Sequence, residues 1–209
     1  MNFKIRSVRP IENEPISEVV LEIPGEKPKR LEVFSDFCRE CGISVGECDE
    51  ETAASLRDCA GLTEAYRKGE RLLAFSPNSE KVLIAKLRQR GVTADHARRA
   101  AQILAQRGFI DDRENALAEA EKCVKKLWGP RRILSELSAK GYRGEALCEA
   151  RAFLEDVDFS ASLSALIDKK YRRILSSGDE KDMERTVAAL VRYGYTPREA
   201  IAAIRRAKC

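Results

Sequence analysis

One eleven-residue pattern occurs three times in the chain without a gap, and it limits the possible folds more than any other feature. It covers residues 83–93, 133–143 and 186–196, and the glycines that these copies share are 50 and 53 residues apart. In each copy an apolar residue stands four positions before the glycine and another stands three positions earlier, so both lie on one face of a helix. A repeat of this length is typical of helical arrays, in which each unit buries its apolar face against its neighbours.

The glycine of each copy is expected to end its helix. Only glycine freely adopts the left-handed backbone conformation that follows many helices, and Gly91, Gly141 and Gly194 hold this position. Thr93 and Thr196 are suited to begin the next helix, because a threonine hydroxyl accepts a hydrogen bond from a free N–H group there. The residue after each glycine is expected to pack back on the last helical turn; these residues are Val92, Tyr142 and Tyr195.

A further helical stretch precedes each copy and completes a unit of three helices; the stretches cover residues 62–74, 112–127 and 158–175. The first part of the chain differs, because its apolar residues alternate or are β-branched, as in strands. Such segments are residues 3–8, 18–23 and 30–34. A turn at 24–28 and short helices near 35–41 and 49–58 complete this region.

The sequence therefore predicts a mainly α-helical fold. We expect an elongated array of three tandem three-helix repeats, preceded by a small N-terminal β hairpin or meander with short helices. The expected domains are an N-terminal β-hairpin region at residues 1–60 and repeats at 61–108, 109–156 and 157–209.

The chain is expected to be a cytoplasmic protein that lies outside the membrane. Of the 209 residues 44% are hydrophobic and 34% are charged, and the longest apolar runs, such as residues 187–191, fall far short of a membrane span. The first residues do not open a signal peptide. The seven cysteines are therefore expected to be reduced thiols, most of them small apolar core residues.

The charges are distributed unevenly along the chain. Residues 1–75 hold 11 Lys and Arg against 15 Asp and Glu, a net charge of −4, whereas residues 76–209 hold 27 against 19, a net charge of +8. Since clustered cations attract phosphate, the later part of the chain is the expected partner of a polyanion.

Two basic stretches are the candidate contacts to DNA or to a protein filament on DNA. The first surrounds a Trp-Gly-Pro helix break and the second lies in the third repeat; their cations are Lys122, Lys125, Lys126, Arg131, Arg132, Lys169, Lys170, Arg172 and Arg173. The first stretch has no acid, and its two arginines are expected in the first turn of a helix, away from its apolar stripe, where guanidinium and free N–H groups together suit a phosphate. The alternative is a solvated charged face. A weaker basic run lies at residues 205–208.

Two aromatic residues adjoin these cations. Trp128 and Tyr171 are able to stack on bases, as in single-strand binding proteins, but an aromatic residue on a helix is more often part of a core. Both interpretations stay open from the sequence.

No residue is assigned to catalysis, to a cofactor or to a metal. The cysteines Cys38, Cys41, Cys48 and Cys59 lack the paired spacing of a zinc site, and His96, the only histidine, is expected to be exposed. The pair at residues 111–112 precedes a helix, where acidic residues cap the N-terminus, so helix capping is favoured over a nuclease site. We find no phosphate-binding glycine loop or nucleophile motif.

Several motifs, in order and spacing, resemble the RecX family over nearly the whole chain. The central ones are Gly108-Phe109-Ile110-Asp111-Asp112, Trp128-Gly129-Pro130-Arg131-Arg132-Ile133, Glu136-Leu137 and Lys140-Gly141-Tyr142. Ser79-Glu80 with Leu83, Leu87 and Gly91 is similar to the first-repeat line of that family, and residues 42–47 are similar to its N-terminal turn. The chain departs from the family at residues 76–78, where flanking arginines are missing, which argues against DNA contact by the first repeat. It also has Asn115 in place of an aromatic residue, which we interpret as a packing change.

The resemblance implies a non-enzymatic regulator, generally an inhibitor, of the RecA recombinase. Such proteins lodge in the groove of the RecA–DNA filament and have no known cofactor. Partners would then be the RecA filament and single- or double-stranded DNA, contacted by a monomer, with no membrane partner. The sequence alone leaves the direction of regulation open, and it leaves open which face meets protein and which meets DNA.

Two other functions stay open. A helix-turn-helix transcription factor has similar local units, but no helix rich in base-reading residues and no dimerisation element is apparent. A helical adaptor that binds only protein would treat the basic faces as solvated.

The repeat architecture predicts the solution dimensions. Small-angle scattering should give a radius of gyration well above about 17 Å, the value for a compact domain of this length. A value near 17 Å would contradict the elongated array.

Overall fold

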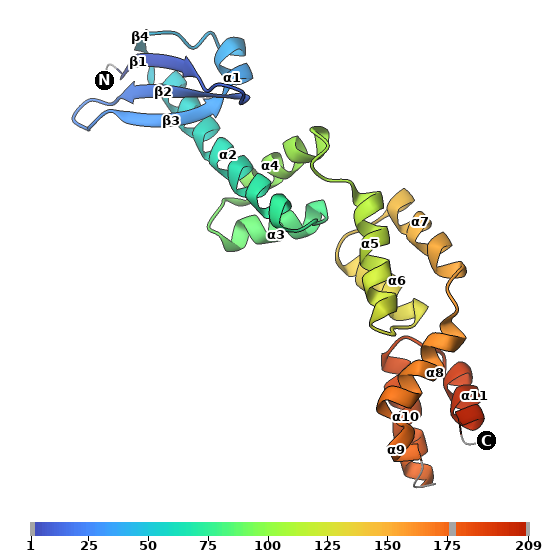
Figure 1. Cartoon of the computed structure of the whole chain (residues 1–209). Helices are drawn as coiled ribbons and strands as arrows, with labels where there is room; N and C mark the ends of the chain where they lie inside the picture. Colours follow the sequence, from blue (N-terminus) through green and yellow to red (C-terminus); the bar gives the residue numbers. More distant parts are fainter. Residues whose placement is uncertain (1–2, 176–178, 208–209) are drawn as a thin grey trace. The chain divides into compact units, whose positions relative to one another are not determined.

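The computed structural model describes residues 3–175 and 179–207, and the chain forms two compact units, residues 1–110 and 111–209 (Figure 1). The first unit contains the sheet and the first repeat, and the second contains the other two repeats. None of the described helices has the length and apolar character needed to cross a membrane. The division of the chain into four domains stays a prediction.

The N-terminal sheet has four antiparallel strands in the order β3-β2-β1-β4. The expected meander is confirmed as β1 (Phe3–Pro10), β2 (Ile16–Glu22) and β3 (Lys29–Phe34), whose alternate side chains, such as Phe3 and Ile5, are buried. A fourth strand that the sequence pattern does not predict, β4 (Gly46–Cys48), pairs with β1. A strand of three residues is too short for alternation to reveal.

One long helix replaces two expected ones. After α1 (Ser35–Glu40), helix α2 runs without interruption over Glu50–Phe75, and Asp49 caps it by accepting a hydrogen bond from the Thr52 N–H at 2.8 Å. The helices expected at 49–58 and 62–74 are thus one element, and the boundary expected between residues 60 and 61 lies inside it. Gly61 is kept helical because α4 packs on it: a Cβ there would lie 2.6 Å from His96 Cε1.

The first unit is completed by α3 (Glu80–Gln89) and α4 (Ala94–Gln106), which share one core with α2 and the sheet. His96 is not exposed as expected: its side chain is only 16% exposed, and its Nε2 lies 2.8 Å from an Asp58 carboxylate oxygen on α2. The contact holds α4 against α2.

The second unit contains the other two repeats (Figure 1). Its helices are α5 (Asp112–Lys125), α6 (Pro130–Ala139), α7 (Gly144–Glu155), α8 (Phe159–Lys170), α9 (Arg172–Leu175), α10 (Glu180–Arg192) and α11 (Pro197–Ala207). The helix expected at 158–175 is interrupted at Tyr171, which separates α8 from α9. Asp111 caps α5, as expected, by accepting from the Arg113 and Glu114 N–H groups.

The glycine turns are confirmed in all three copies. Gly91, Gly141 and Gly194 have φ values of +81°, +96° and +99°. In each turn the N–H of the next residue donates to the carbonyl of the leucine four positions before the glycine, at 3.1 to 3.3 Å. This bond satisfies a carbonyl that the helix itself leaves free.

The described cysteines differ in exposure, and Cys48 is half-buried. Cys38, Cys59 and Cys123 are buried in the cores, as expected, whereas Cys41 and Cys148 are exposed. Cys209 lies outside the described residues. Within the described ranges, no group of three or more His, Cys, Asp or Glu side chains is arranged to hold a metal ion.

The protein should become less stable in alkali because of the two buried tyrosines that follow Gly141 and Gly194. Tyr142 and Tyr195 are 4% and 1% exposed, and burial raises the pKa of each to about 12 from 10.0. Their neutral form is favoured in the folded state, so this contribution is complete below pH 10 and is lost as the pH rises towards 12. By pH 11 each tyrosine should lower the free energy of unfolding by about 1.4 kcal/mol.

The variant Tyr142→Phe has no hydroxyl to titrate at this position. Urea unfolding at pH 8, 10 and 11 should show a smaller alkaline loss in this variant than in the parent, with the pH 8 value as the internal control. An equal loss in both proteins would contradict the proposed cause.

Candidate nucleic-acid interface

The first basic stretch surrounds the turn between α5 and α6. Lys122 and Lys125 lie in the last turn of α5, and Arg131 and Arg132 lie in the first turn of α6, directly after Pro130. This placement agrees with the expected helix break. Lys125 and Arg131 are exposed, and neither forms an ion pair with a described residue.

The turn itself is unusual because a leucine holds the position that glycine holds elsewhere. Leu127 has a φ of +60°, and the Trp128 N–H donates to the Cys123 carbonyl at 3.2 Å, as in the glycine turns. A left-handed leucine costs about 1 kcal/mol or more. Packing offsets this cost, since the Leu127 side chain lies against the core of the third repeat and its carbonyl accepts a hydrogen bond from the Tyr195 hydroxyl at 3.2 Å.

The second basic stretch lies at the junction of α8 and α9. Lys169 and Lys170 end α8, and Arg172 and Arg173 form the first turn of α9. All four are exposed. Tyr171 between them is half-buried and packs on the core of the third repeat, which supports its interpretation as a core residue. In the tail, Arg205 and Arg206 are exposed on α11 and Lys208 lies outside the described residues.

Stacked cations and aromatic rings join the two stretches. The Arg132 guanidinium lies 3.8 Å from the centroid of the Trp128 ring and 5.6 Å from that of the Tyr193 ring. Lys126 lies 5.1 Å from the Trp128 ring, and Lys170 lies 5.0 Å from the Tyr193 ring and donates to its hydroxyl. We call these five residues the cation–aromatic ladder. Each such contact contributes about 0.5–2 kcal/mol, and together they carry positive charge from the second repeat to the third.

The ladder favours the charged form of Lys170 and leaves Trp128 half-buried. The hydrogen bond to the Tyr193 hydroxyl raises the pKa of Lys170. The Trp128 side chain packs on the core of the second repeat, and Arg132 lies over its ring. The tryptophan is therefore not an open platform for a base.

Two glycines allow the turns of the second and third repeats to touch. The Gly129 N–H donates to the Tyr193 carbonyl at 2.7 Å, and the Arg132 guanidinium donates to the Arg192 carbonyl at 3.2 Å. A Cβ at Gly194 would lie 2.5 Å from Arg132 Cβ, and one at Gly129 would lie 2.6 Å from the Gly194 carbonyl. We call this contact the glycine joint.

The glycine joint gives the α6 N-terminus different surroundings from those that the sequence predicts. Arg132 is half-buried between two rings and does not simply face solvent, and the Gly129 and Arg132 N–H groups already donate within the protein. Replacement of Arg132 would therefore disturb the joint. The expected role of this helix end in binding a phosphate through free N–H groups is correspondingly reduced.

The fold of this chain is similar to that of two solved structures. No family model and no curated protein matches the chain. A solved structure described as regulatory protein RecX is 18% identical with a TM-score of 0.73, and the match covers 94% of this chain and 96% of that one. RecX from Lactobacillus salivarius is also 18% identical, with a TM-score of 0.57 over 71% of this chain and 97% of that one. The chain therefore has the RecX fold, as the motif resemblance implied.

The glycine joint predicts that two glycines with similar backbone conformations differ in their tolerance of alanine. Gly194→Ala should lower the free energy of unfolding by clearly more than Gly91→Ala, because both add strain at positive φ but only Gly194 lacks space for a methyl group. The difference should be about 1–3 kcal/mol in urea unfolding.

The fluorescence of Trp128, the only tryptophan, provides a local readout of the same change. Its emission should shift in Gly194→Ala and stay unchanged in Gly91→Ala. Equal destabilisation of the two variants with an unchanged emission spectrum would show that the joint contributes nothing.

Proposed function

We propose that this chain is a non-enzymatic regulator, and specifically an inhibitor, of a RecA-type recombinase, acting on the recombinase–DNA filament in recombination and DNA repair. Two observations of different kinds support the proposal. The motifs at residues 108–112 and 128–142 resemble those of the RecX family, and the fold is that of two solved RecX structures, one of them described as a regulatory protein.

The cation–aromatic ladder is the observation that carries the proposed mode of action. Lys126 and Lys170 are 44 residues apart in the chain, yet both belong to one ladder in the second unit. The exposed Lys125, Arg131 and Arg172 belong to the same two stretches. A continuous surface of this kind suits the phosphates of a DNA strand, whereas two separate patches would each bind weakly.

The contact that we propose is to the DNA backbone and not to the bases. Trp128 is half-buried with Arg132 over its ring, and the exposed cations are lysine and arginine side chains at helix ends, which bind phosphate well. Backbone contact is independent of base sequence. It suits a protein that follows a filament along any DNA, single- or double-stranded, better than it suits a transcription factor that reads one site.

Charge reversal at the exposed cations tests the proposal. We expect Lys125→Glu with Arg131→Glu, and separately Lys169→Glu with Arg172→Glu, to weaken binding to a fluorescent dT oligonucleotide. Each neutralised phosphate contributes about 0.7 to the slope of log affinity against log salt on single strands, so each double variant should flatten that slope by up to about 1.4. Arg132 is left unchanged because it supports the joint.

The control is Arg143→Glu with Arg151→Glu, which makes the same change in net charge at exposed positions of α7 and its N-terminus. The three variants and the parent should then be compared in strand exchange by a RecA-type recombinase. The parent and the control should inhibit, and the two test variants should inhibit less. If the test variants keep the salt slope and the inhibition of the parent, this surface does not bind the filament.

A further inference from the structure

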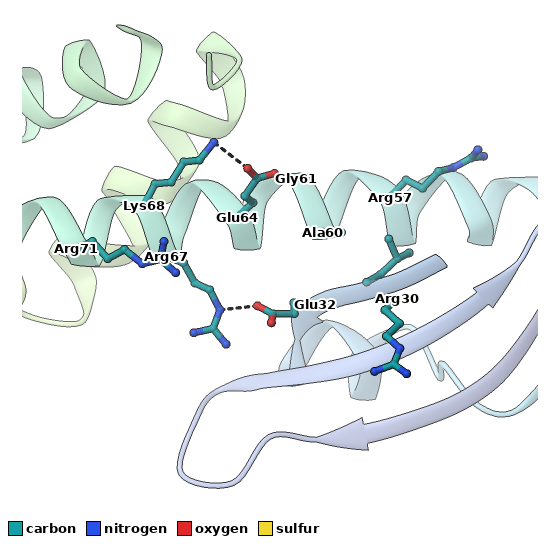
Figure 2. Close-up of a pocket in the computed structure, with 10 residues that line it drawn as sticks. Arg30, Glu32, Arg57, Ala60, Gly61, Glu64, Arg67, Lys68 and Arg71 are labelled. Carbon is teal, nitrogen blue, oxygen red and sulfur yellow. Dashed lines mark hydrogen bonds and ion pairs between the residues drawn. The ribbon is translucent and has the colours of Figure 1, made fainter. Parts of the chain in front are cut away.

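The first unit contains a groove lined by basic side chains, although residues 1–75 have a net charge of −4. It lies between α2 and β3 and has a volume of about 630 Å³ (Figure 2). Five basic side chains line it, namely Arg30, Arg57, Arg67, Lys68 and Arg71, together with the acidic Glu32 and Glu64. The order of these charges along the groove determines what it can bind.

The centre of the groove is paired and slightly negative. Arg67 donates to both Glu14 and Glu32, and Lys68 lies 2.8 Å from Glu64. Figure 2 shows Arg67 directed towards Glu32 on the strand and Lys68 directed towards Glu64 along the helix. Arg30, the third cation between the two ends, lies 3.8 Å from Glu18. Four carboxylates thus share three cations, and the centre has one net negative charge.

The two ends of the groove are positive. Arg57 and Arg71 stand at opposite ends, and among the described residues neither has a carboxylate within ion-pair distance (Figure 2). The Arg57 guanidinium lies 5.8 Å from the Phe3 ring centroid and donates to the Ala53 carbonyl at 3.1 Å, which fixes its position. Arg57 and Arg71 are 14 residues apart on one helix, so their backbones are about 21 Å apart.

An apolar pocket adjoins the Arg71 end. It has a volume of about 320 Å³ and is lined by Leu72, Phe75 and Arg90 together with Lys68 and Arg71 of the groove. Phe75 is 93% exposed, the most exposed of the large apolar side chains described. An apolar side chain placed on Phe75 would remove both surfaces from water.

We infer that this groove binds an extended acidic segment of a partner protein. The segment has carboxylates about 21 Å apart to meet Arg57 and Arg71, uncharged residues over the paired centre, and an apolar side chain on Phe75. An extended chain advances about 3.3 Å per residue, so six or seven residues separate the two acidic positions. The inference does not depend on the proposed function, which uses cations of the second unit.

The charge order favours a peptide over a nucleic acid. A single strand places a phosphate at every nucleotide, so several phosphates would lie close to Glu32 and Glu64, where like charges repel. A peptide is able to place its carboxylates at the two ends alone. The acid-free basic stretch at residues 122–132 has no such barrier.

The test uses the full chain and a fluorescein-labelled nonapeptide, Asp-Asp-Gly-Ser-Gly-Ser-Asp-Asp-Leu, followed by fluorescence anisotropy. The comparison peptide has the same composition with the four aspartates together in the middle. We expect the first peptide to bind more tightly. Arg57→Glu and Arg71→Glu should each lower the affinity for this peptide by about five-fold or more, as expected for the reversal of one exposed ion-pair partner.

The matched control is Arg88→Glu, which makes the same charge change at an exposed position of α3 that lines neither cavity. It should leave peptide affinity unchanged. Phe75→Ser should lower the affinity for the nonapeptide but not the affinity for a version of it that ends in Ser instead of Leu. Circular dichroism of every variant shows whether α2 stays folded.

Three results would overturn the inference. The first is equal affinity for the two peptides. The second is an equal effect of Arg88→Glu and Arg57→Glu. The third is that the peptide does not bind, whereas a dT oligonucleotide does and its affinity falls with Arg57→Glu and Arg71→Glu. The groove would then be a nucleic-acid site. The proposed function is tested separately, since Lys125→Glu with Arg131→Glu should leave peptide binding intact.

Discussion

The left-handed turn after the central helix of each repeat is the constraint on which the rest of the structure depends. At this turn the chain reverses within two residues, and an N–H group donates to the leucine carbonyl that the helix leaves free. The turn brings the next helix back onto the apolar face of the first one, so that the second and third repeats each form a core, whereas the first repeat shares its core with the sheet. In the third repeat the same turn has a second role, because Gly194 also lies against the backbone and side chain of Arg132.

This second role explains why the two basic stretches of the second unit meet at Tyr193. The Gly129–Gly194 contact brings the α5–α6 turn against the end of α10, and Arg132 then lies between the rings of Trp128 and Tyr193. The left-handed Leu127 is part of the same arrangement, since its side chain packs in the third repeat while its backbone belongs to the second. Backbone strain, stacked cations and positive surface charge therefore have one cause, which is the close contact of two turns.

The two units use charge differently. In the second unit the cations of residues 122–132 stand together without acids, which suits a polymer that is charged along its whole length. In the first unit acids and cations alternate on α2 and β3, and the ion pairs of Arg67 and Lys68 neutralise the centre of a groove whose ends stay positive. The net charge of a region predicts the first kind of surface but not the second, because the second depends on which charges are paired.

The sequence by itself determined the repeats, the glycine turns, the caps at Thr93 and Asp111 and the three strands of the meander, since each depends on residues within about one turn or one strand of one another. It also identified both basic stretches. Only the tertiary structure decided that α2 is one helix, that His96 is held by Asp58, and that the stretches meet through Tyr193. The contacts of His96 and Tyr193 join residues 23 to 61 positions apart. Local periodicity contains no information about such pairs, because their contact exists only after the helices have packed.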